Sequence, residues 1–157
     1  MKGPPLKSLV KPGCKLEITA RLATVGPRSQ RLWGRMTAPQ MICHLNDSFL
    51  GVMGDKAIEL PAGFSLWPAF KWIPLYMPMK WPQGVPTRPE VDQFGGGTPP
   101  AHFESDIRDL LVSLDKFTAQ PRLFQFRPHP IFRVMTDAQW MRWGYLHMDH
   151  HLRQFGA

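Results

Sequence analysis

The amino-acid sequence predicts an all-α fold of four helices. Two of the helix starts are marked by capping boxes, Thr37-Ala-Pro-Gln40 and Thr136-Asp-Ala-Gln139. In a capping box, the threonine hydroxyl accepts a hydrogen bond from an early backbone N–H and the glutamine accepts one from the threonine N–H. A further observation is that apolar residues recur at helical spacing after each of these starts.

The two capped helices are predicted over residues 37–54 and 136–156. In the first, His44 lies on an apolar side, and glycines suited to a helix end follow. In the second, a single stripe carries Trp140, Trp143, Gly144, His147, His151 and Gln154. These two helices therefore bring histidines onto their apolar faces.

Two more helices complete the prediction. Residues 101–120 carry apolar side chains at helical spacing before Pro121, which is typical of a buried packing helix. An N-terminal helix over residues 15–26 is expected between two prolines, and residues 28–36 are expected to form a further turn.

A stretch rich in proline, glycine and aromatic residues spans residues 61–100, between the second and third helices. Its aromatic content argues against a solvated linker, so we expect an ordered loop over the helices, either as structural cover or as a lid that gates a site. Gly95-Gly96-Gly97 lacks the flanking strand and helix of a dinucleotide-binding turn.

Length and composition indicate one domain over residues 1–157. The 157 residues are 43% hydrophobic and 20% charged, which is enough apolar material for one core. The net charge of +7 raises nucleic-acid binding as an alternative. The arginines are scattered singly, however, and this argues against a phosphate-binding stripe.

The cysteines and the hydropathy indicate a reducing, aqueous environment. Cys14 and Cys43 are the only cysteines and form no metal-binding or disulfide pattern. No apolar run approaches the roughly 20 residues of a membrane span, and prolines and lysines occupy the opening segment. We therefore expect a cytoplasmic protein without a membrane partner.

The histidines provide the functional hypothesis. His147 and His151 are four residues apart on one helix, so their rings share a face, and His44 lies on another apolar face. Buried imidazoles need partners, and one divalent cation would satisfy three of them. Taken alone, His44 fits a hydrogen-bonded core residue at least as well, and a spacing of four is common by chance.

Other polar residues have alternative interpretations. Asp47, three residues after His44, could support a ligand imidazole or act as a base, or could be an exposed helix carboxylate. His150 lies about 100° around the helix from His151 and could replace it as a ligand. His102 and His129 are expected to be structural or surface residues. Trp140 and Trp143 could line a pocket but fit core packing better.

Three motifs resemble the DinB/YfiT-like superfamily. Residues 146–156, LHMDHHLRQFG, resemble its last-helix pattern H-x-x-H-H-x-x-Q, and residues 33–45, WGRMTAPQMICHL, resemble its second helix. Residues 129–132, HPIF, look like the lead-in of an uncharacterised branch that ends in HHLRQFG. The chain departs from the superfamily before the final glutamine, where it has Arg153 and the superfamily has a glycine.

The resemblance implies a four-helix bundle in up-down-down-up order and a homodimer. It also implies that His44, His147 and His151 bind one divalent metal ion, with zinc or nickel expected. Relatives that act on low-molecular-weight thiols make a thiol transferase or isomerase the leading hypothesis, and a hydrolase that activates water is also compatible. The alternative is a non-catalytic binding module with an unknown ligand.

Overall fold

The computed structural model describes residues 6–61 and 71–157, and all regular secondary structure in this part of the chain is helical. Residues 62–70 of the predicted loop lie outside the described residues. Within these described ranges, the named elements are four long helices, one short helix and one 3-10 turn: α1 (Pro12–Leu22), α2 (Ala38–Met53), α3 (Trp72–Tyr76), η2 (Pro89–Val91), α4 (Phe103–Thr118) and α5 (Asp137–Gln154). The prediction of an all-α fold is confirmed.

Both predicted capping boxes form at the helix starts. Thr37 Oγ1 accepts from the Gln40 N–H at 3.3 Å, and Gln40 Oε1 accepts from the Thr37 N–H at 2.9 Å. The bonds between Thr136 and Gln139 have the same lengths. Since these bonds satisfy backbone donors that would otherwise lack partners, the sequence fixes where α2 and α5 begin.

The N-terminal region differs from the prediction in two ways. Helix α1 begins at Pro12, a position that suits the first helical residue, and it ends at Leu22 rather than Gly26. The prediction of a further helical turn over residues 28–36 was wrong, because these residues form non-helical turns and bends. Gly34 has a φ of 84° there, and the end of α5 holds the backbone through a bond from the Leu32 N–H to the Gln154 carbonyl.

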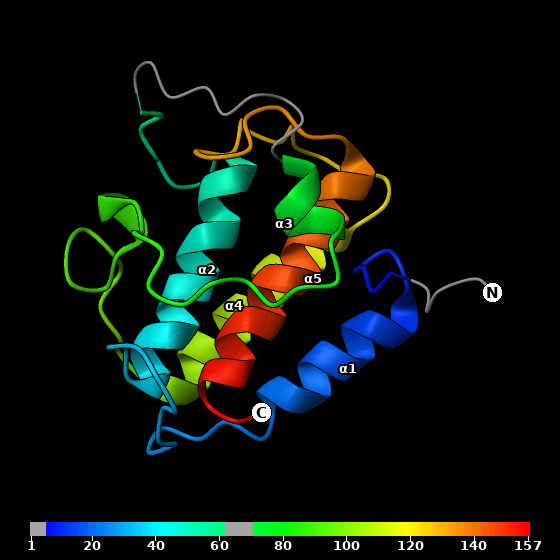
Figure 1. The fold of residues 1–157 in the computed structure, drawn as a ribbon. Coiled ribbons are helices and arrows are strands. Elements are labelled where there is room, and N and C mark those ends of the chain that lie inside the picture. The colour runs from blue at the N-terminus through cyan, green and yellow to red at the C-terminus, as the bar shows by residue number, and fades with distance from the viewer. Residues whose placement is uncertain (1–5, 62–70) are drawn as a thin grey trace.

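The core lies where α2, α4 and α5 meet, with α1 packed along α5 (Figure 1). Phe49, Phe117 and Trp143, one from each of the three central helices, contact each other with ring centroids 4.8 to 6.1 Å apart. Gly144 permits this close packing, because a Cβ there would lie 2.9 Å from the Phe117 ring. This core fixes α2 and α5 next to each other.

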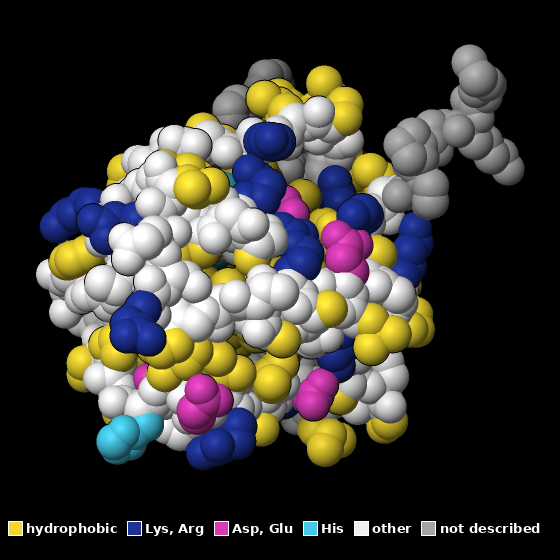
Figure 2. Space-filling view, turned by 90° about the horizontal axis from the view of Figure 1, so that it is seen from below, with side chains coloured by type: hydrophobic (Ala, Val, Ile, Leu, Met, Phe, Trp, Pro, Cys, Tyr) yellow, Lys and Arg dark blue, Asp and Glu magenta, His cyan; other side chains and the backbone are white. Residues whose placement is uncertain are grey.

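The described residues of the 61–100 segment include α3 and η2, which lie against the long helices. Helix α3 packs against α5, and η2 packs against α2. The glycines of this segment form a compact turn, in which the Gly96 N–H donates to the Pro89 carbonyl at 2.7 Å. Among the described residues, no helix is long and apolar enough to cross a bilayer. On the face drawn in Figure 2, Lys and Arg side chains gather in the upper middle with Asp or Glu among them.

His129 holds the turn that precedes α5. Its Nδ1 accepts hydrogen bonds from the Ile131 and Phe132 N–H groups at 3.0 and 3.1 Å, and its ring packs on the Phe132 ring. Burial lowers the pKa of His129 to about 3, because desolvation disfavours the imidazolium ion. The neutral ring is therefore part of the fold, as the sequence suggested for this residue.

The Thr136 cap can be tested by substitution. Thr136→Ala removes the hydroxyl that accepts from the Gln139 N–H, and should lower the free energy of unfolding by about 1 kcal/mol. Thr136→Ser keeps the hydroxyl and should stay close to the wild type. Urea unfolding followed by circular dichroism measures both. Equal losses in the two variants would contradict a role for the cap.

The buried His129 predicts a pH dependence of stability. Between pH 6.5 and 3 the unfolded chain binds a proton at this residue and the folded chain does not, so stability falls as pH falls. The expected contribution is about 1.4 kcal/mol for each pH unit in that window. His129→Asn keeps an acceptor for the turn and cannot titrate. Its unfolding free energy in chelator, measured from pH 7 to 4, should have a slope smaller by about one proton, and an unchanged slope would refute the assignment.

Candidate metal centre

The structure brings His44 of α2 together with His147 and His151 of α5. Ring centroids of the three pairs lie 4.7 to 5.4 Å apart. Nε2 of His44 lies 3.3 Å from Nε2 of His147. One nitrogen from each ring lies within 4.8 Å of the others, so the three residues could hold a metal ion.

Helix geometry explains this placement. His147 and His151 lie one turn apart, so their side chains project from the same side of α5. His44 lies on the buried face of α2 and is 4% exposed. Because α2 packs against α5, the two helix faces together supply the cluster.

The outer nitrogens of two rings are already bonded to the protein. His44 Nδ1–H donates to the Val91 carbonyl at 2.8 Å, which leaves its Nε2 as a free lone pair. His151 Nδ1 lies 3.1 Å from Gln154 Oε1, and the amide nitrogen of Gln154 donates to the Trp33 carbonyl at 3.0 Å. Since the amide oxygen only accepts, His151 Nδ1 carries the proton and its Nε2 is the free nitrogen.

The imidazoles are held neutral. Burial lowers the pKa of His44 below its usual 6.5, although the bond to Val91 opposes the shift. Burial lowers the pKa of His147 and His151 well below 6.5, and repulsion from the neighbouring imidazoles lowers both further. At neutral pH the cluster therefore presents unprotonated nitrogens, the form in which histidine binds a metal.

The nitrogen spacing fits a shared ion. Two imidazole ligands at about 2.1 Å from a tetrahedral ion lie about 3.4 Å apart, close to the 3.3 Å between His44 and His147. The three ligand nitrogens lie within 4.8 Å of one another, so the wider pairs must approach to about 3.4 Å when one tetrahedral ion binds all three.

Asp47 is buried, at 1% exposure, and is not the exposed carboxylate that the sequence also allowed. Its oxygens accept from the backbone N–H and the hydroxyl of Thr98, both at 2.7 Å, and pair with Lys56 at 2.8 Å. Its negative charge partly opposes the lowering of the His44 pKa, but its bonds among the described residues run to Thr98 and Lys56 and not to an imidazole. Asp47 therefore anchors the segment that carries Val91.

The remaining histidines lie outside the cluster. His150 is half-buried beside the Trp33 and Trp81 rings, with centroids 4.8 and 6.1 Å away, and the set with metal-ligand spacing contains His151 instead. Burial lowers the pKa of His150 to about 4. His102 is exposed at the start of α4, as expected of a surface residue.

Three other candidates, Cys43, Trp140 and Trp143, are buried. Burial raises the pKa of Cys43 to about 12, so its thiol is not poised as a nucleophile. Trp140 and Trp143 are buried in the core, although the Trp143 ring also lies edge-on to His147 at 4.9 Å. Both tryptophans therefore pack the core rather than lining an open cavity.

The sequence analysis did not predict three contributions to the site, which come from Val91, Trp81 and the hydrogen bonds of Gln154. The carbonyl of Val91 carries no side-chain signal, and Trp81 reaches His147, at 6.3 Å between centroids, from the loop. Gln154 had a detectable signal, since a residue three positions after His151 lies beside it on a helix.

Comparison with known proteins identifies a family but no characterised relative. A search of curated proteins and of solved structures finds no match to this chain. The model of one family, described as a protein of unknown function (DUF1569), matches residues 15–157, which include all three clustered histidines. The chain therefore belongs to the DUF1569 family.

Proposed function

We propose that this protein binds one divalent metal ion through Nε2 of His44, His147 and His151. The observation that best supports the proposal is that protein acceptors already hold the outer Nδ1–H groups of His44 and His151. Bonds of this kind fix the tautomer and the orientation of a ligand imidazole. We further propose that the helices form a DinB/YfiT-like four-helix bundle, and that the protein is a cytoplasmic homodimer.

The donor set favours zinc or nickel. Neutral imidazole nitrogens suit these ions, whereas magnesium and calcium prefer oxygen ligands. Three protein ligands also leave a coordination position open, which is typical of catalytic sites. A bound ion would supply Lewis acidity at that position and lower the pKa of a water or a low-molecular-weight thiol there.

We accordingly propose a metal-dependent enzyme of the thiol transferase, isomerase or hydrolase type. The chain's own contribution is to keep three ligand nitrogens neutral and to exclude water from His44. The alternative is a non-catalytic DinB-like module. A metal-loaded protein that leaves thiols and electrophiles unchanged would identify that alternative.

Metal binding is tested with paired histidine variants. Wild-type protein should retain about one zinc or nickel ion per chain in elemental analysis. His147→Ala should lose this ion, because two imidazoles remain and the nitrogen nearest to His44 is gone. The control is His102→Ala, which removes an exposed histidine outside the cluster and should bind metal as the wild type does.

Circular dichroism of both variants establishes that they fold. Wild-type protein that stays metal-free after incubation with zinc and nickel would refute the proposal. Equal metal content in the wild type and His147→Ala would show that the ion binds elsewhere.

Gln154 should affect the affinity for the metal ion through its bond to His151, without itself being a ligand. Gln154→Met removes the acceptor for His151 Nδ1–H and the bond to Trp33, and should weaken metal binding about 10- to 100-fold. Gln154→Glu keeps an acceptor for His151 and should bind metal more tightly than the methionine variant. Competition with a chromophoric chelator measures the affinities, and equal affinities in the two variants would exclude this role.

A further inference from the structure

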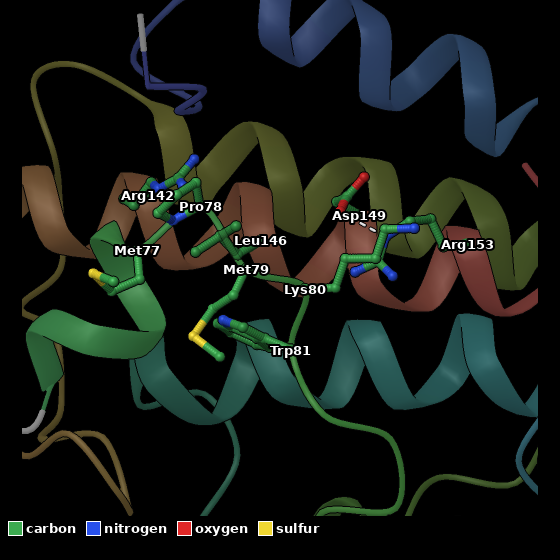
Figure 3. A pocket seen from close by; sticks show the side chains of 9 residues that line it. All are labelled: Met77, Pro78, Met79, Lys80, Trp81, Arg142, Leu146, Asp149 and Arg153. Carbon is green, nitrogen blue, oxygen red and sulfur yellow. Dashed lines mark hydrogen bonds and ion pairs between the residues drawn. The ribbon is translucent and has the colours of Figure 1, made fainter. Parts of the chain in front are cut away.

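A pocket of about 220 Å³ lies beside the histidine cluster, between the segment Met77–Trp81 and α5. Helix α5 contributes Arg142, Leu146, Asp149 and Arg153, which recur every three or four residues and so share one face of the helix. In Figure 3, Arg142 lies at one end of the pocket, Asp149 and Arg153 lie at the other, and Leu146 and Met79 lie between them. This face of α5 is separate from the one that carries His147 and His151.

Positive charge dominates the lining. The pocket has three cationic side chains, Lys80, Arg142 and Arg153, and one carboxylate, Asp149. That carboxylate is already shared by two guanidinium groups, at 2.8 Å from Arg21 and 2.9 Å from Arg153. Asp149 is therefore paired with these two arginines, and among the described residues it forms no ion pair with Lys80 or Arg142.

Arg142 and Lys80 have no carboxylate partner among the described residues. Arg142 is 9% exposed, and its Nε and Nη1 groups donate to the backbone carbonyls of Leu75 and Lys7. These acceptors are neutral, so the buried charge of Arg142 is not balanced by them. Lys80 is exposed at the mouth of the pocket and forms no ion pair in this part of the structure.

The middle of the pocket is apolar. Met77, Met79, Leu146 and Trp81 supply its surface, and methionine side chains adapt readily to ligands of different shape. Met77 and Met79 are more than half exposed, at 52% and 55%. The volume is below the roughly 300 Å³ at which drug-sized ligand sites begin, so the pocket suits a small molecule.

We propose that this pocket binds a small organic anion, a carboxylate or a phosphate monoester with a short apolar chain. The anionic group would face Lys80 and Arg153 at one end of the pocket, and the apolar chain would lie on Leu146, Met79 and Trp81. The Trp81 ring also approaches His147, with centroids 6.3 Å apart, so the ligand would lie next to the histidine cluster. The site is formed by residues other than the three histidines and does not depend on a bound metal.

The proposal is tested by NMR titration of the full chain in chelator. Hexanoate and butyl phosphate are the anionic probes, with hexanol as the neutral control and hexylamine as the cationic one. Both anions should cause saturable shifts of the Lys80 amide and of the Trp81 indole N–H, which a Trp81→Phe spectrum identifies. The two control compounds should cause neither.

Matched charge reversals locate the site. Lys80→Glu changes an exposed side chain and should weaken hexanoate binding at least about tenfold. Arg108→Glu makes the same change in net charge at an exposed position of α4 outside the pocket, and should bind hexanoate as the wild type does.

Three results would overturn the proposal: no saturable shift with either anion, equal binding of hexanol, or equal weakening by the two reversals. Binding that requires added zinc and disappears in His147→Ala would also overturn it, because the anion would then be a metal ligand. Because chelator is present in the main titration, a failure of metal binding leaves this result unaffected.

Discussion

The burial of three neutral imidazoles against one another is the constraint on which the site depends. Imidazole nitrogens removed from water need hydrogen-bond partners, and here the fold satisfies the outer ones of His44 and His151 with Val91 and Gln154. The inner nitrogens are left facing one another, with 3.3 Å between those of His44 and His147. Apolar side chains would suffice for packing at these positions, so the polar cluster supports the proposal of a metal site.

The loop between α2 and α4 is part of this arrangement. Asp47 accepts two hydrogen bonds from Thr98, and so holds the loop on the same helix that carries His44. The compact glycine turn lies between Thr98 and η2 and is hydrogen-bonded to Pro89 of η2. The Val91 carbonyl, at the end of η2, accepts the hydrogen bond from the His44 ring. A buried carboxylate one turn from a ligand can therefore support the site through the backbone, without contacting the imidazole.

Periodicity and capping predicted the four long helices, and helix spacing predicted that His147 and His151 share a face. Those features are local, so a single sequence contains them. The partner of His44 is a backbone carbonyl 47 residues away, and no residue type marks it. The bends at 28–36 were missed for the same reason, since the end of α5 holds that backbone by contacts distant in sequence. The meeting of His44 with the C-terminal pair was suggested by family resemblance, and the coordinates supply its geometry.

Helix α5 contributes to the core, to the histidine cluster and to the pocket, each through a different face. Trp140, Trp143 and Gly144 pack the core, His147 and His151 face His44, and the face with Arg142 and Leu146 lines the pocket. Successive side chains on a helix point in directions about 100° apart. If the sequence of α5 moved by one residue relative to the other helices, all three faces would therefore be misplaced together. The capping box at Thr136 fixes one end of this helix, and the bond from Gln154 to Trp33 fixes the other. The position of α5 therefore sets the geometry of the core, the histidine cluster and the pocket together, and Trp143, which contacts both Phe49 and His147, links the core to the cluster.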